Sequence, residues 1–236
     1  MKLIKYKSNV SYTDYDERTD RAVMGFVKGD NYSLAIDAGN SPKTAREFLN
    51  LINQQPDYVV LTHYHWDHTF GLSEFSGISI SSKRTAKAID TIYNKVWNEE
   101  SFNHYCIDGS IEPFCAEHMR EEYGSDFSSI HVKLPDITFK NTLNIELGNC
   151  KVTLMKIQNP HTNDGIIVYV PDRKIIFLGD ALCEELRGDQ WIDHPNKTQF
   201  MYSSLKPLDF KLAVNAHFDP MTKEELLNNL KDRLQD

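Results

Sequence analysis

The residues with the clearest chemical potential in this sequence lie in one short run, LTHYHWDH, which begins at Leu61. Four of its side chains are potential metal ligands: His63, His65, Asp67 and His68. Imidazole and carboxylate groups suit zinc and similar metals, and three histidines this close together would repel one another if protonated. Alternate residues of an extended chain point the same way, so His63 and His65 can reach one ion. If a helix follows, Asp67 and His68 can reach a second ion, and the run therefore predicts a metal site.

Three further candidates each follow an apolar segment typical of a β-strand. His161 follows KVTLMKIQNP, Asp180 follows KIIFLG and His217 follows LAVNA. Side chains at the carboxyl ends of several strands can converge on one edge of a sheet assembly. A single HxH motif would be weak evidence, because histidines recur on surfaces and in cores by chance. Here five of the nine histidines occupy such positions, which favours a metal centre over structural histidines.

Four motifs of the chain resemble those of the metallo-β-lactamase superfamily in order and spacing. They are HxHxDH from His63 to His68, PHTNDG around His161, FLGDAL around Asp180 and AHFDP around His217. The resemblance covers nearly the whole chain and implies an α/β (α+β) fold, a four-layer αβ/βα sandwich with the metal site at the edge between two sheets. We expect a single domain of this kind over residues 1–236.

The resemblance also implies which residues hold which metal. By this resemblance, one ion would be held by His63, His65 and His161. The other would be held by Asp67, His68 and His217, and Asp180 would bridge the two. Two divalent ions about 3.5 to 4 Å apart lower the pKa of a shared water towards about 7, so that a metal-bridging hydroxide can attack a carbonyl or phosphoryl centre. Asp67 and Asp180 are then the catalytic carboxylates. Two zinc ions are expected first, and iron or manganese can take the same ligands.

The neighbours of these residues have less specific interpretations. Asp37 in LAIDAG resembles an aspartate of the family that accepts a hydrogen bond from a ligand histidine. Tyr64 and Trp66 either wall the site or pack into the core, and Cys183 is interpreted as a buried thiol rather than a ligand. The remaining histidines have no ligand spacing and are expected on the surface or in a lid: His104, His118, His131 and His194.

Short apolar runs alternate with amphipathic stretches, as in an α/β or α+β domain. One helix is predicted to begin at Ser41-Pro42, one to carry Ile89 to Val96, and one to begin with the capping pair Thr222 and Glu225. Strands are predicted at 32–36, 58–61, 78–81, 143–147, 152–157, 166–170, 174–178 and 212–216. Pro171-Asp172 predicts a hairpin turn between the sixth and seventh of these strands.

The segment 98–135 fits neither pattern. It contains eight acidic residues against Arg120 and Lys133, a net charge of −6, together with several aromatic side chains. Two interpretations remain open: an insertion that forms a lid over the site, or an acidic helix pair that covers an apolar edge.

Composition excludes several classes of protein. The chain has 236 residues, of which 40% are hydrophobic and 25% charged, and no apolar run approaches the roughly 20 residues of a membrane helix. The amino terminus lacks the apolar stretch of a secretory signal, and the four cysteines form no CxxC pair, so we expect a cytoplasmic protein. A net charge of −8 argues against a nucleic-acid partner, and no membrane partner is expected. The oligomeric state is left open.

The sequence thus predicts a dinuclear metal-dependent hydrolase acting on a small ester, thioester, lactone or amide-like substrate. One alternative is an iron-dependent oxidoreductase on the same fold, similar to the sulfur dioxygenases. A second alternative is a non-catalytic, metal-stabilised interaction module. It is less favoured, because such a module would not need the complete set of metal ligands that the sequence contains.

Overall fold

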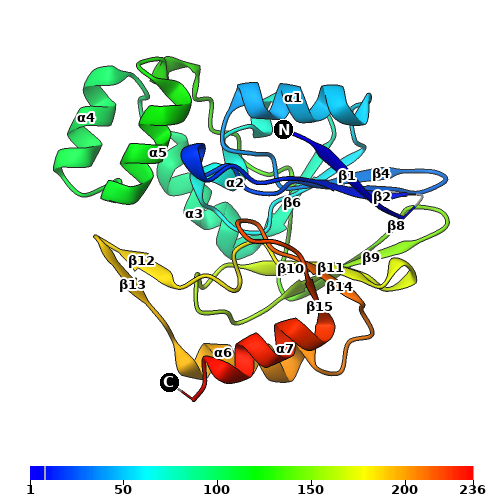
Figure 1. The fold of residues 1–236 in the computed structure, drawn as a ribbon. Coiled ribbons are helices and arrows are strands. Elements are labelled where there is room, and N and C mark those ends of the chain that lie inside the picture. The colour runs from blue at the N-terminus through cyan, green and yellow to red at the C-terminus, as the bar shows by residue number, and fades with distance from the viewer. Residues whose placement is uncertain (8, 236) are drawn as a thin grey trace.

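The computed structural model describes residues 1–7 and 9–235, which form two facing β-sheets with helices on both outer faces (Figure 1). The first sheet has seven strands in sequence order. They are β1 (Leu3–Lys7), β2 (Val10–Thr13), β3 (Gly25–Lys28), β4 (Ser33–Ile36), β5 (Tyr58–Val60), β6 (Ile78–Ser82) and β7 (Ile137–Phe139). Strands β1 to β4 pair antiparallel and β4 to β7 pair parallel, so β4, β5 and β6 all end at the same edge.

The second sheet has six strands in the order β15-β14-β11-β10-β9-β8. They are β8 (Thr142–Glu146), β9 (Lys151–Lys156), β10 (Ile166–Val170), β11 (Ile175–Phe177), β14 (Leu212–Val214) and β15 (Met221–Thr222). The predicted hairpin is confirmed, because β10 and β11 pair antiparallel around a short turn at Pro171–Arg173. A separate two-stranded sheet, β12 (Glu185–Arg187) and β13 (Gln190–Ile192), projects from this half of the molecule.

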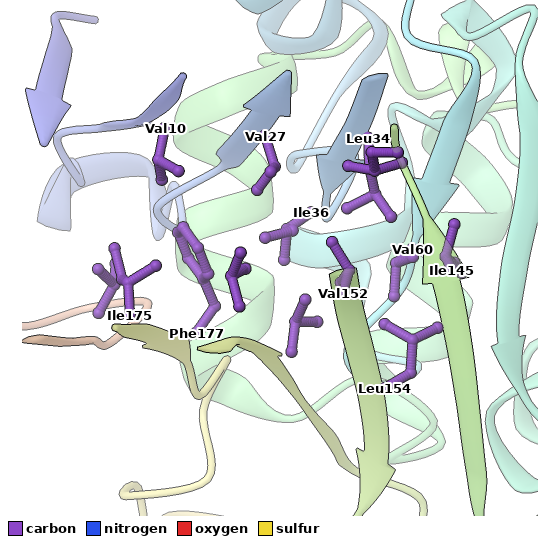
Figure 2. Close-up of a cluster of buried hydrophobic side chains, with 14 of the residues drawn as sticks. Val10, Val27, Leu34, Ile36, Val60, Ile145, Val152, Leu154, Ile175 and Phe177 are labelled. Carbon is purple, nitrogen blue, oxygen red and sulfur yellow. The ribbon is translucent and has the colours of Figure 1, made fainter. Parts of the chain in front are cut away.

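Apolar side chains hold the layers together. Figure 2 shows the cluster between the two sheets, where Val27 and Ile36 of the first sheet meet Val152 and Phe177 of the second. The outer face of the first sheet packs on α1 (Pro42–Ile52) and α3 (Lys83–Tyr93), and that of the second packs on α6 (Pro195–Leu205) and α7 (Lys223–Asp232). The predicted fold class, a four-layer αβ/βα sandwich, is confirmed.

The predicted helices begin where local chemistry allows. The Ser41 hydroxyl accepts the N–H of Thr44, and Pro42 takes the first position of α1. Thr222 and Glu225 form the predicted capping box of α7. The helix expected to reach Val96 ends earlier: α3 stops at Tyr93, and Val96 lies exposed beyond it.

Each of the eight predicted strands is present within two residues of its expected bounds. The prediction missed seven further strands: β1, β2, β3, β7, β12, β13 and β15. Most of these have only two to four residues, which is too short for an alternating pattern to be distinctive.

The segment 98–135 contains two helices, α4 (Glu99–Ile107) and α5 (Pro113–Tyr123). Their inner side packs on Phe70 through a cluster that includes Phe102 and Phe127, whose rings stack 3.8 Å apart. The segment is therefore a helix pair over an apolar edge, and its action as a lid stays a prediction. Among the described residues, no helix combines the length and apolar character needed to cross a membrane.

Candidate metal centre

The edge where β5 ends carries four of the predicted ligands. After β5 the chain bends through residues 62–64, and His65, with an extended backbone, takes the N-cap position of the short helix α2 (Trp66–Thr69). This helix turns Asp67 and His68 inward, where both are buried. The helix expected after His65 is therefore present, although the segment before it bends instead of remaining extended, and the run is split into two pairs, His63 with His65 and Asp67 with His68.

The second sheet supplies the other three predicted residues. His161 lies in the loop after β9, Asp180 in the loop after β11 and His217 in the loop after β14. Because all three loops leave the second sheet beside the β5 edge of the first, segments far apart in the chain meet there.

The seven side chains form two groups that share Asp180. One group is His63, His65, His161 and Asp180, and the other is Asp67, His68, Asp180 and His217. Within each group the potential ligand atoms all lie within 4.8 Å of one another. The structure therefore brings all seven predicted residues together in the expected grouping, and their binding of metal is part of the proposal below.

Asp180 faces both groups with different oxygens. Its Oδ2 lies 3.6 Å from His63 Nε2 and 3.3 Å from His161 Nε2. Its Oδ1 lies 3.2 Å from His68 Nε2 and 3.4 Å from His217 Nε2. A carboxylate oriented in this way can link two cations.

Several of these buried atoms are unsatisfied within the protein. Among the described residues, His63 Nε2, His68 Nε2 and Asp180 Oδ1 have no hydrogen-bond partner. Buried polar atoms are almost always paired, since leaving one unpaired costs about 1 to 3 kcal/mol. A bound cation would satisfy all three atoms, so this nitrogen and oxygen donor set fits divalent metal ions.

Electrostatics divide the histidines of the centre. Burial alone would lower the pKa of His68 and His217, but the neighbouring carboxylates Asp67 and Asp180 outweigh it and hold both pKa values well above the ordinary value. Burial lowers the pKa of His65 to about 3, and burial with the neighbouring His68 holds the pKa of His63 well below its ordinary value. Both imidazoles are therefore neutral, which is the form that binds metal. Burial alone would raise the pKa of Asp180, but His217 and His68 outweigh it and hold that pKa well below its ordinary value. Its carboxylate is ionised.

A family model described as "Metallo-beta-lactamase superfamily" matches residues 19–217. The chain belongs to the metallo-beta-lactamase superfamily. The family predicted from the four sequence motifs is thus confirmed.

Several known proteins are similar to this superfamily member. The acyl-coenzyme A thioesterase MBLAC2 of Gallus gallus is 21% identical over 89% of this chain and 77% of the relative. A metallo-beta-lactamase from Pontibacter korlensis superposes with a TM-score of 0.66 at 19% identity, covering 100% of this chain and 99% of that one. The sec-alkylsulfatase Pisa1 from Pseudomonas sp. gives a TM-score of 0.69 at 14% identity, over 98% of this chain and 40% of the sulfatase. At these identities the solved structures establish the fold alone.

Hydrogen bonds behind the centre orient its histidines. His68 Nδ1 donates to Asp37 Oδ2 at 2.8 Å, which is the contact expected of Asp37, and Thr62 donates to both oxygens of the same carboxylate. His161 Nδ1 donates to the Glu184 carbonyl at 2.7 Å. Each bond fixes one ring nitrogen as a donor and turns the other towards the centre.

Sequence reasoning missed Asp20. Its Oδ1 lies 3.4 Å from His217 Nδ1, where it can orient that ring, and burial together with Asp67 raises the pKa of Asp20 to about 7. Asp20 has left-handed backbone angles at the end of a short 3-10 turn, Glu17–Thr19. A single aspartate in a polar segment gives no spacing signal, so the sequence offered no means of finding it.

A cavity of about 880 Å³ lies over the metal centre of this metallo-beta-lactamase-like chain. His65, Asp67 and Asp180 form part of its floor. Tyr64 and Trp66 both line it, while Trp66 is also buried in the cluster under α4 and α5. The two interpretations of Trp66, wall and core, therefore both apply.

Cys183 also lines the cavity; the residue as a whole is partly exposed, and burial raises the pKa of its thiol well above the ordinary value. It is absent from both ligand groups, in keeping with its exclusion as a ligand. Among the described residues, the four other histidines also lie outside these groups: His104, His118, His131 and His194. His194 instead contacts Glu185 at the base of the β12–β13 hairpin.

Proposed function

We propose that the protein is a dinuclear metal-dependent hydrolase that cleaves a small ester, thioester, lactone or amide-like bond. The observation that carries the proposal is the orientation of Asp180, which directs one oxygen to each of two complete ligand groups. A site built only for stability would need one such group, whereas two groups that share a carboxylate are typical of hydrolytic centres.

The donor set suits two divalent ions, with zinc expected first and iron or manganese as alternatives. His63, His65 and His161 would hold one ion, and Asp67, His68 and His217 would hold the other, with Asp180 between them. When bound, such ions supply a polarised acyl oxygen and an ionised water.

The chain's own carboxylates then have separate roles. Asp180 fixes the spacing of the two halves of the site. Asp67 Oδ2 is 2.9 Å from His68 Nε2 and 3.1 Å from His217 Nε2, and its ionised carboxylate can hold a proton released by the attacking water. The water oxygen bonds to the acyl carbon and the bond to the leaving oxygen, sulfur or nitrogen breaks. A proton passes to that leaving atom, which gives a carboxylic acid and an alcohol, thiol or amine.

Two further observations favour a small acyl substrate. The relative from Gallus gallus is named an acyl-coenzyme A thioesterase, which makes thioesters the first substrates to test. The walls of the cavity above the centre are mostly apolar, and its volume lies within the range of small-molecule sites.

The test is a hydrolysis screen with protein stripped by a chelator and reloaded with zinc, manganese or iron. We expect two metals per chain, no turnover after stripping, and recovery of turnover for at least one acyl substrate on reloading. A histidine outside both ligand groups and outside the cavity lining, His104, supplies the control variant His104→Ala, which should retain metal and turnover. A single iron per chain with oxygen uptake and no hydrolysis would replace this proposal with the oxidoreductase alternative. Two bound metals without any turnover would favour an interaction module.

A further inference from the structure

The cavity extends well beyond the metal centre. It continues between the α4–α5 helix pair and the β12–β13 hairpin, and six large apolar side chains form this distal part: Phe70, Trp97, Ile111, Phe114, Met119 and Trp191. A volume of about 880 Å³ is near the upper end for small-molecule sites and exceeds what a scissile bond alone requires. The distal part therefore has room for a substantial portion of a ligand.

Both walls of this distal part are anchored to the body of the protein. On one side, the Tyr123 hydroxyl donates to the Asn40 carbonyl at 2.7 Å, and Ser41 donates to Glu122 at the end of α5. On the other side, Arg233 of the carboxyl-terminal region holds Asp193 at 2.8 Å, directly after β13. The distal part is therefore a preformed space rather than a gap between loose segments.

The two walls meet through a pair of aromatic rings. Phe114, near the start of α5, and Trp191, in β13, lie with ring centroids 5.4 Å apart in an edge-to-face arrangement. Trp191 is 48% exposed on a short hairpin outside the two main sheets, an unusual position for so large an apolar side chain. Its contact with Phe114 joins the two walls of the distal part of the cavity.

We infer that this distal part binds the linear apolar acyl chain of the substrate, and that Phe114 and Trp191 set the chain length that is accepted. The inference rests on the proposed function, since it assumes that the acyl carbon lies at the metal centre. The walls consist of aromatic and aliphatic carbon, and a saturated chain bound against them removes apolar surface of both partners from water, which is favourable.

Charges in the cavity argue against a polyanionic occupant of the distal part. Among the described lining residues outside the ligand groups, the basic side chains are Lys95 and Arg233. Arg233 is paired with Asp193, and the Lys95 ammonium lies 4.3 Å from the centre of the Tyr105 ring. Glu112 and Glu184 also line the cavity and add negative charge. The walls thus favour an uncharged chain, and a charged leaving group would extend towards solvent.

The first experiment measures binding without chemistry. All three tryptophans of the chain, Trp66, Trp97 and Trp191, line the cavity, so intrinsic fluorescence reports its occupancy. Zinc-loaded protein is titrated with the uncharged alcohols n-butanol, n-hexanol, n-octanol and n-decanol. We expect the Kd to fall about fourfold for each added methylene that is buried, up to the length of the cavity. A Kd independent of chain length would overturn the inference.

The second experiment tests the two aromatic residues. Both are partly exposed, so Phe114→Ala and Trp191→Ala should fold and keep their metal content. Each should raise the Kd of n-decanol by at least about fivefold and leave that of n-butanol nearly unchanged. Phe200→Ala removes an aromatic ring of similar exposure outside the cavity and should change neither constant. An equal effect of all three variants, or none in the cavity pair, would contradict the assignment.

Hydrolysis of acyl esters and thioesters of two to ten carbons separates this inference from the proposed function. Length-dependent alcohol binding without hydrolysis of any substrate would remove the proposed function and leave an apolar binding site. Hydrolysis at a rate independent of acyl length would confirm the hydrolase and overturn the inference.

Discussion

His68 donates from Nδ1 to Asp37 Oδ2 at 2.8 Å, and its Nε2 consequently faces Asp67 at 2.9 Å and Asp180 at 3.2 Å. Asp37 is held in turn by the backbone and side chain of Thr62, and its backbone has a positive φ of 62°. The orientation of one proposed metal ligand, His68, thus depends on a carboxylate that lies behind it.

Replacing Asp37 by Ala should weaken metal binding in the group that contains His68 by roughly 10- to 100-fold, because the ring loses the acceptor that fixes its orientation. Metal content after dialysis against a competing chelator measures the effect. Asp57→Ala is the matched control, since Asp57 accepts two hydrogen bonds from Ser33 on the same sheet and belongs to neither ligand group. Equal metal loss in both variants would mean that Asp37 acts on stability rather than on the site.

The residues that the structure brings together at the candidate site could be found in the sequence because their pattern is dense or local. Four of them lie within the six positions from His63 to His68, and His161, Asp180 and His217 each follow an apolar strand. Asp20 could not be predicted in this way, because its place beside His217 depends on a backbone turn and on contacts between opposite ends of the chain.

Helices differ in the same way in how clearly their sequences indicate them. Helix α1 buries four residues, Pro42, Thr44, Ala45 and Phe48, whereas α4 buries Phe102 and α5 buries Met119 and Tyr123. With so few buried positions, neither helix of the pair shows the periodicity that predicts a helix. The helices become stable through packing on Phe70 and Trp66, which lie far away in sequence.

Asp180→Ala should abolish turnover, with a loss on the order of a thousandfold or more, because the variant lacks the carboxylate that spans both groups. Circular dichroism should remain close to that of the wild type, since Asp180 lies in a loop. Asp209→Ala, at an exposed aspartate paired with Lys174, should retain full turnover. Unchanged kcat/KM in Asp180→Ala would contradict the bridging role.

Removing bound metal should lower thermal stability. Metal present at a hundred times its Kd adds about 2.7 kcal/mol, which for a chain of this size corresponds to a Tm change of roughly 5 to 11 °C. The loss follows because His63 Nε2 makes no hydrogen bond among the described residues, so removal of the ion leaves this buried nitrogen unsatisfied. Differential scanning fluorimetry before and after chelation tests this expectation. An unchanged Tm with verified metal removal would show that the centre is stable without ions.

The rate at which each thiol is alkylated should depend on whether the cysteine lies in the cavity wall. Burial, with smaller contributions from Asp67 and Asp20, raises the pKa of Cys115 to about 12, whereas Cys106 lies outside the cavity and is less buried. Because the thiolate is the reactive form and its fraction falls as the pKa rises, Cys115 should alkylate much more slowly than Cys106 at pH 8. Mass spectrometry after timed exposure to iodoacetamide measures both rates. Faster modification of Cys115 would mean that the cavity is more open and more polar than its walls indicate.

The anchoring of the α4–α5 helix pair can be tested at Tyr123. Tyr123→Phe removes the hydroxyl that donates to the Asn40 carbonyl at 2.7 Å and leaves a buried acceptor unpaired. We expect a loss of about 1 kcal/mol in the free energy of unfolding, together with a higher KM, because α5 carries Phe114 and Met119 into the cavity wall. Tyr32→Phe, at a tyrosine that is 46% exposed and distant from the cavity, is the control for removal of a hydroxyl. Metal content should be the same in all three proteins, since α5 contributes no residue to either ligand group. Metal loss in Tyr123→Phe alone would show that the helix pair supports the metal centre itself rather than only the cavity above it.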